Sequence, residues 1–245
     1  MTLLAAARSI VTYAVMAVYI IAIGAPFILV SIVARSPRLL YGVGLLGVRI
    51  GLALSGLRWK ASGTGHIQRH RAAVYAINHS SNVEPPIIFA ALSELMPRLR
   101  VLYKAELRKL PILVRAFDVA GFVPLERGNR DQSLPAIDAA AAALVEGNSF
   151  LIFPEGTRSR TGELLPFKKG GFIMALRAQA PIVPVAIIGA RDAMRKGSPW
   201  IYPVRISVRF GEPVETAGLG IEGRDQLVQQ VRDSVAALIA EGQIA

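Results

Sequence analysis

The chain has 245 residues, with 28 Lys and Arg against 17 Asp and Glu, so its net charge is +11. That length fits one large domain, or a smaller domain with an appendage, and a hydrophobic fraction of 53% excludes bulk disorder. The absence of Cys excludes a disulfide scaffold and a Cys-ligated metal site. The first acidic residue is Glu84, so the positive charge is concentrated in the N-terminal third and indicates a polyanionic partner. Long apolar stretches between these cations favour membrane lipid over nucleic acid.

The N-terminal region predicts two apolar helices. Residues 9–34 form an uncharged run of 26 residues, which as a helix reaches about 39 Å and exceeds a hydrocarbon core of about 30 Å. Gly24 and Pro26 lie inside this run and are expected to break or kink the helix. A second apolar stretch, residues 39–57, follows a turn at residues 36–37.

Several arrangements fit this N-terminal region. Two helices joined by a tight turn form a hairpin that dips into one leaflet, and this is the arrangement we expect for residues 1–57. A single span followed by an interfacial helix is the main rival. A cleaved signal peptide and a buried helix of a soluble core are further interpretations, although the apolar run of residues 9–34 is longer than a signal peptide needs.

The remainder, residues 58–245, predicts one α/β domain with a central mixed β-sheet flanked by helices. Short apolar or β-branched runs alternate with helical stretches, which is the pattern of such folds. The expected strands are 73–77, 100–103, 121–125, 150–153, 182–188 and 204–210. The expected helices are 85–95, 111–119, 133–146, 171–180 and 224–240.

The strongest catalytic candidate is a histidine–carboxylate pair. His79 follows a predicted strand, and Glu84 lies at the start of a predicted helix, where α/β sheets place their ligand sites. A carboxylate five residues away can hold one ring nitrogen and leave the other as a base. No serine nucleophile motif G-x-S-x-G and no Cys is present. We therefore expect His79 to deprotonate a substrate hydroxyl, which attacks an acyl carbonyl directly. No metal site is expected.

Three cations follow three predicted strands at the same sheet edge. They are Lys104, Arg127 and Arg158, the last in the sequence Phe-Pro-Glu-Gly-Thr-Arg-Ser of residues 153–159. Gly156 permits a tight turn there, and an arginine fork suits a phosphate group. Together the three cations predict a site for a phosphate.

These blocks resemble the glycerolipid acyltransferase family, in particular its 1-acyl-sn-glycerol-3-phosphate acyltransferases. That family has the boxes N-H-x-x-x-x-D, G-x-x-x-x-x-R, F-P-E-G-T-R-S and V-P-I/V-x-P-V in this order. Their counterparts here are residues 78–84, 121–127, 153–159 and 182–185. The sequence departs from the pattern at Glu84, where the family has Asp, and this leaves the choice of lyso-lipid acceptor open.

The resemblance implies a fatty acyl transfer from a thioester to the free hydroxyl of 1-acyl-sn-glycerol-3-phosphate, which gives phosphatidic acid. It implies that His79 is the general base, oriented by Glu84. The substrate-phosphate site it implies comprises Lys104, Arg127, Glu155, Gly156, Thr157 and Arg158. The implied acyl donor is a thioester on coenzyme A or on acyl carrier protein, which acts as a co-substrate, and no bound cofactor or nucleic acid is expected. The implied location is a membrane, with the catalytic domain on the cytoplasmic face of a bacterial inner membrane.

Two other functions compete with this one. The first is the same chemistry on another lyso-lipid or on glycerol-3-phosphate itself. The second is a non-enzymatic, basic membrane protein that binds lipid. The second accounts for the charge and the apolar N-terminus, but it does not account for a histidine–carboxylate pair beside a phosphate site.

Overall fold

A computed structural model describes residues 3–126 and 130–244 of the chain. Within these ranges the centre is a seven-stranded sheet in the order β1-β7-β6-β2-β5-β3-β4. The strands are β1 (Arg58–Ser62), β2 (Val74–Ile77), β3 (Leu99–Lys104), β4 (Val123–Leu125), β5 (Ser149–Ile152), β6 (Ile182–Ile188) and β7 (Arg205–Phe210). All neighbours are parallel except β6 and β7, so the sheet is mixed, as expected from the sequence.

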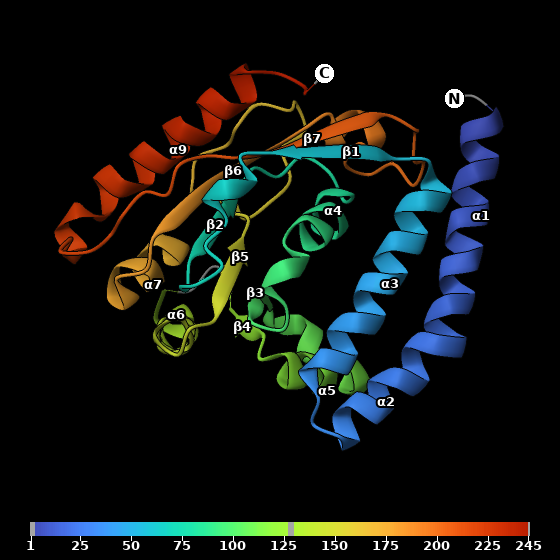
Figure 1. Cartoon of the computed structure of the whole chain (residues 1–245), viewed down its shortest axis with the longest axis horizontal. Helices are drawn as coiled ribbons and strands as arrows, with labels where there is room; N and C mark the ends of the chain where they lie inside the picture. The colour runs from blue at the N-terminus through green and yellow to red at the C-terminus, as the bar shows by residue number, and fades with distance from the viewer. Residues whose placement is uncertain (1–2, 127–129, 245) are drawn as a thin grey trace.

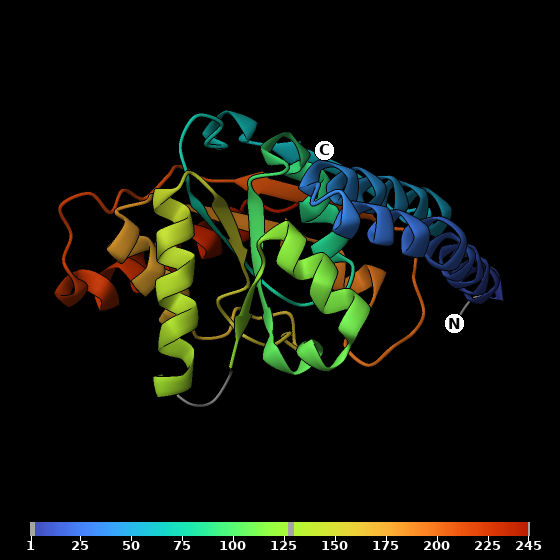
Figure 2. The same cartoon turned by 90° about the horizontal axis from the view of Figure 1, so that it is seen from below.

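Helices cover both faces of this sheet. The α/β part contains α4 (Glu84–Ala91), α5 (Pro111–Ala120), α6 (Arg130–Val145), α7 (Gly170–Ala178), α8 (Ala190–Ala193) and α9 (Arg224–Ala240). One core joins α4 to one face through residues such as Tyr75 and Ile88, and the other joins α6, α7 and α9 to the opposite face through residues such as Phe150 and Phe172. Figure 2 shows α6 and the N-terminal helices on opposite sides of the strands.

The N-terminal helices form a long hairpin beside the α/β layer (Figure 1). The first arm consists of α1 (Leu3–Tyr19), a π-helical turn (Ile20–Gly24) and α2 (Ala25–Val33), and the second arm is α3 (Pro37–Ser55). The sequence predicts a break or kink at Gly24 and Pro26. The structure has a π-helical turn there, and α2 follows it directly, so the helical path continues without a break. Both arms, Leu3–Val33 and Pro37–Ser55, are long and apolar enough to cross a membrane.

The hairpin packs on the α/β part through specific contacts. Tyr41 of α3 stacks on Phe89 with ring centroids 5.8 Å apart and meets Phe122 edge-on. At the other end, Ser9 of α1 accepts a hydrogen bond of 2.9 Å from the backbone N–H of Ile201. Leu52 and Leu57 are part of the same core as α4. The hairpin is therefore packed into the fold on one side, while it exposes an apolar surface on the other.

The expected strands and helices are present, with ends that differ by at most three residues except in the helix expected at 85–95. Two elements are not predicted by the sequence. The edge strand β1 has the sequence R-W-K-A-S, whose two cations conceal any apolar alternation, and α8 spans only four residues. The expected helix 85–95 ends as α4 at Ala91 and continues as a separate 3₁₀ turn at Ser93–Leu95.

Asn78 extends the pairing of β2 with β6 beyond the end of the strand. Its Nδ2 donates to the carbonyl of Ile187 at 3.0 Å, and its Oδ1 accepts from the N–H of Ile187 at 2.7 Å. Both residues are buried. These two hydrogen bonds fix the backbone immediately before His79.

Replacing Asn78 by Ala should lower the free energy of unfolding by about 2–4 kcal/mol, because it leaves two buried backbone groups of Ile187 unpaired. Thermal and denaturant unfolding in detergent would measure the loss. Asn148→Ala is the matched control, since Asn148 makes one hydrogen bond to Ala143 at a less buried position. Equal stability losses in the two variants would contradict the bridging role of Asn78.

Candidate active site

The candidate site lies where the parallel strands β2, β3, β4 and β5 end. Residues 78–84 follow β2, Lys104 closes β3, and residues 153–159 follow β5. Because these strands are parallel, their carboxyl ends meet at one edge of the sheet. The topology therefore carries residues 78–84, Lys104 and residues 153–159 to one region.

His79 and Glu84 meet as expected. Nδ1 of His79 lies 2.7 Å from Oε2 of Glu84, whose side chain is 0% exposed, while the imidazole is 17% exposed. A carboxylate only accepts hydrogen bonds, so Nδ1 carries the proton and Nε2 keeps its lone pair. The pair can thus present a base of fixed tautomer.

Ser80 completes the surroundings of the buried carboxylate. Its N–H lies 2.9 and 3.0 Å from the two oxygens of Glu84, and its hydroxyl donates to Oε1 at 2.7 Å. A buried carboxylate without such partners is costly, so these bonds offset the desolvation of Glu84 beside His79. Ser80 belongs to no motif that predicts a role for it, and its position next to the histidine is the only signal in the sequence.

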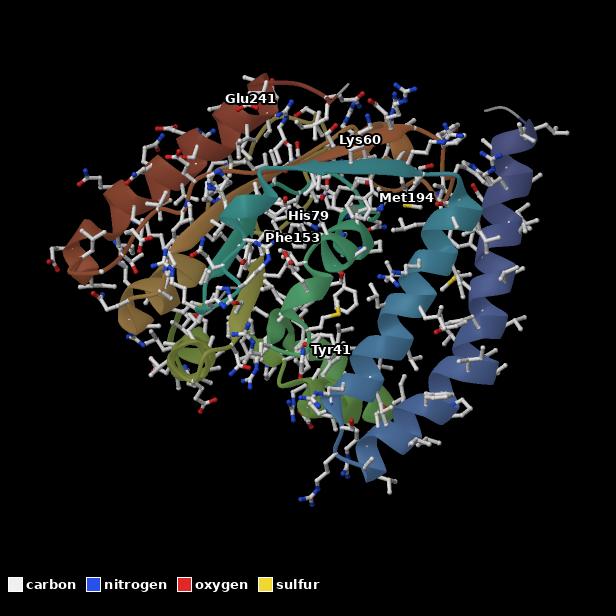
Figure 3. The ribbon with its side chains drawn as sticks, in the orientation of Figure 1. Tyr41, Lys60, His79, Phe153, Met194 and Glu241 are labelled. Atoms are coloured by element: carbon white, nitrogen blue, oxygen red, sulfur yellow. The ribbon has the colours of Figure 1, made fainter. Side chains whose placement is uncertain are left out.

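The imidazole is held from a second side by an aromatic ring. Phe153 stacks on His79 with ring centroids 4.2 Å apart and an interplanar angle of 28°. Figure 3 shows the two labelled side chains next to each other. This contact leaves the ring little freedom to turn away from Glu84.

Glu155 points into the protein and braces the backbone. Its Oε1 accepts from the N–H of His79 at 2.6 Å, and its Oε2 accepts from the N–H of Leu165 at 3.1 Å. Burial raises the pKa of this carboxyl group above its ordinary value, and the two N–H bonds partly oppose that shift. Its carboxylate is therefore part of the framework that fixes the backbone of His79.

Gly156 allows the chain to turn sharply beside a lysine. Its φ is +70°, and an added Cβ would lie 2.8 Å from Cε of Lys168. The stem of Lys168 therefore packs directly over this glycine. The turn brings Thr157 and Arg158 to the rim of the site, where Thr157 is exposed and Arg158 is half-buried.

Lys196, between α8 and β7, holds the loop of residues 153–159 from outside. Its Nζ donates to the carbonyl of Arg158 at 2.9 Å and to the hydroxyl of Thr157 at 3.1 Å. Arg191 donates in the same way to the carbonyl of Arg160. No sequence signal connected these cations with the loop, because they belong to a separate segment.

The remaining phosphate candidates are placed differently. Lys104 lies at the end of β3 and forms an exposed ion pair of 2.8 Å with Glu106. Arg127 falls outside the described residues. Within the ranges 3–126 and 130–244, no ion pair joins the guanidinium of Arg158 or the ammonium groups of Lys168 and Lys196 to a carboxylate. These three cations therefore keep a positive field at the rim.

A large apolar cavity lies next to the histidine segment, residues 78–84, between the hairpin and α4. Its volume is about 560 Å³, and Asn82 and Val83 form the end near His79. Met16 of α1 and Gly47 of α3 line its walls. An added Cβ at Gly47 would lie 2.7 Å from Cε1 of Tyr19, so this glycine allows the two arms of the hairpin to approach closely.

Comparisons with known proteins give a consistent result. The sequence is 34% identical to a 1-acyl-sn-glycerol-3-phosphate acyltransferase of Limnanthes douglasii over 180 residues, which is 73% of this chain and 62% of that protein. It is 33% identical to the protein of the same name from Limnanthes alba over 196 residues, or 79% and 67% of the two chains. The chain thus spans about two thirds of these relatives.

A solved structure has the same fold. The crystal structure of the 1-acyl-sn-glycerophosphate (LPA) acyltransferase PlsC from Thermotoga maritima matches 98% of both chains with a TM-score of 0.80, at 23% sequence identity. The sequence model of the family described as Acyltransferase matches residues 58–188, from β1 to the end of β6. This match covers more than half of the chain and includes both His79 and Glu84, and the protein therefore belongs to the Acyltransferase family.

Proposed function

We propose that this protein transfers a fatty acyl group from an acyl thioester to the free hydroxyl of 1-acyl-sn-glycerol-3-phosphate, giving phosphatidic acid. The observation that carries the proposal is the bond between His79 and Glu84 at the rim of a cationic loop. The names of the relatives support this acceptor, since they are called 1-acyl-sn-glycerol-3-phosphate acyltransferases.

The reaction follows from the tautomer of His79. Nε2 takes the proton of the acceptor hydroxyl as the oxygen attacks the thioester carbonyl. The imidazolium that forms is stabilised by the ionised Glu84. When the intermediate collapses, the carbon–sulfur bond breaks and the thiolate leaves with the proton from Nε2. The ester product and a free thiol result, and His79 returns to its starting state.

The arrangement of charge and apolar surface supports this pair of substrates. Arg158 and Lys196 flank the place where an acceptor phosphate would lie. The apolar cavity beside Val83 would hold the acyl chain of the donor, and its 560 Å³ lies within the usual 300–1,000 Å³ of ligand pockets. Coenzyme A and acyl carrier protein both remain candidate carriers of that chain.

The hairpin would hold the enzyme at the membrane that contains its acceptor. Large apolar side chains such as Val18, Ile21 and Val33 are exposed along its outer face. Arg8, Arg35, Arg38 and Arg49 lie on or beside the helices and would contact anionic head groups. We propose a location on the cytoplasmic face of a bacterial inner membrane.

Two variants test the catalytic pair. His79→Ala should lower kcat about 10²–10⁴-fold, the usual contribution of a general base, without loss of folding. Glu84→Gln keeps the shape but removes the charge that stabilises the imidazolium, so kcat should fall with little change in KM. Steady-state kinetics with palmitoyl-coenzyme A and lysophosphatidic acid measure both effects.

Glu84→Asp serves as the control for this pair, because it restores the family's residue and keeps the charge. We expect it to be clearly more active than Glu84→Gln. Near-normal turnover by His79→Ala would remove this residue from the mechanism.

The cationic rim is tested through the acceptor. Arg158→Ala should raise the KM for lysophosphatidic acid about 10–150-fold, since a charged hydrogen bond contributes about 1.5–3 kcal/mol. Lys196→Met should act in the same direction, because it frees the loop that carries Arg158. Arg195→Met is the matched control on the exposed neighbour of Lys196. Arg158→Ala should leave the KM for a monoacylglycerol acceptor unchanged, because this acceptor has no phosphate. An equal rise in KM for both acceptors would indicate a structural role for Arg158.

The membrane role is tested on the outer face of the hairpin. Val18→Asp and Ile21→Asp replace side chains that are 65% and 73% exposed and do not line the large cavity. A carboxylate in a bilayer costs up to about 3 kcal/mol, so binding to vesicles containing phosphatidylglycerol should fall tenfold or more in sedimentation assays. Turnover of a short-chain, water-soluble acceptor should persist. Ile221→Asp, at an exposed site away from the hairpin, is the control, and equal vesicle binding by all three variants would refute the anchor.

A further inference from the structure

A second, smaller cavity lies on the other side of the candidate site. Its volume is about 260 Å³, and it opens where β3, β4 and β5 end, next to the first turns of α6 and α7. The large apolar cavity lies against the opposite face, beside α4 and the hairpin. No step of the mechanism given above uses this smaller space.

The small cavity adjoins the catalytic histidine at one residue. Phe153 is among the residues that line the cavity, and its ring is stacked on His79 with centroids 4.2 Å apart. On the other side of the histidine segment, Asn82 and Val83 belong to the large cavity. The base is therefore flanked by two separate spaces, one on each side.

The chemistry of a thioester requires two such spaces. Its carbonyl carbon must lie at His79, and from this carbon the acyl chain leaves in one direction and the sulfur with its carrier arm leaves in another. If the acyl chain occupies the apolar cavity beside Val83, the carrier arm has to leave past Phe153. The smaller cavity lies on that route.

The lining of the small cavity is amphipathic. Leu102, Ile137 and Leu151 provide an apolar interior, whereas Ser133, Glu126 and Lys168 provide polar groups. The large cavity, in contrast, is lined mostly by apolar side chains and glycines and by no charged side chain. A hydrocarbon chain suits the large cavity, and a chain of alternating methylene and amide groups with a terminal phosphate suits the small one.

We propose that the small cavity binds the phosphopantetheine arm of the acyl donor, with the sulfur beside Phe153 and the phosphate at Lys168. The ammonium group of Lys168 pairs with no carboxylate in the described residues 3–126 and 130–244 and is available to a phosphate. Coenzyme A and acyl carrier protein carry the same arm, so one site serves both. This inference rests on the proposed acyl transfer.

The first test fills the cavity. Ser133 and Ile137 lie one helical turn apart on α6 and both line the space, so Ser133→Trp places an indole at its mouth. This variant should raise the KM for palmitoyl-coenzyme A tenfold or more and leave the KM for lysophosphatidic acid within twofold. Ala139→Trp, on the exposed side of α6, is the matched control and should resemble wild type.

A truncated donor shows whether the arm is what the cavity binds. S-palmitoyl-N-acetylcysteamine keeps only the part of the arm next to the sulfur, so Ser133→Trp should affect its turnover much less. Lys168→Met should weaken the use of palmitoyl-coenzyme A and of palmitoyl-carrier protein, and spare the truncated donor. An effect confined to coenzyme A would mean that the nucleotide is recognised there, and it would overturn the proposal.

Direct binding separates this inference from the proposed function. Calorimetry with free 4′-phosphopantetheine requires no turnover, and we expect binding to wild type that is weakened tenfold or more in Ser133→Trp and Lys168→Met. Failure of wild type to acylate lysophosphatidic acid would refute the proposed function alone if this binding is present. Absence of binding, or a rise in the acceptor KM in place of the donor KM, would refute the cavity assignment.

Discussion

The buried hydrogen bond between His79 and Glu84 is the contact on which the site depends. Glu84 is 0% exposed, so its charge is tolerable only while the ring of His79 and both donors of Ser80 surround it. This requirement fixes the chain between β2 and α4. Three backbone anchors hold the same segment from outside: Asn78 on β6, Glu155 on the N–H of His79, and the N–H of Ser159 on the carbonyl of His79 at 2.7 Å.

The loop of residues 153–159 serves both sides of the site because its residues point in different directions. Phe153 stacks on the imidazole, Glu155 turns inward to the backbone, and Arg158 reaches the rim. Gly156 makes the reversal between them possible with its positive φ. One short segment therefore orients the imidazole of His79 and, under the proposed function, would supply a cation for an acceptor phosphate.

The hairpin has two surfaces, one packed on the α/β part and one exposed. Its inner side contacts α4 and the core through Leu52 and Tyr41 and encloses the large apolar cavity. Its outer side exposes large apolar side chains, among them Val18 and Ile21. Under the proposed function, an acyl chain held in this cavity would lie close to the exposed apolar surface that we propose as the membrane anchor. One element would then serve as both anchor and substrate wall.

The sequence by itself determined the α/β class, the apolar N-terminus and the pair His79 and Glu84. These follow from local periodicity and from residues five positions apart, which depend little on distant parts of the chain. It did not reveal the edge strand β1, because the cations in R-W-K-A-S obscure the alternation. Only the tertiary structure decided that Glu155 faces inward, that Lys196 holds the loop carrying Arg158, and that two cavities flank His79. The physical reason is that each of these features arises between segments far apart in the chain, whose meeting depends on the order of strands in the sheet.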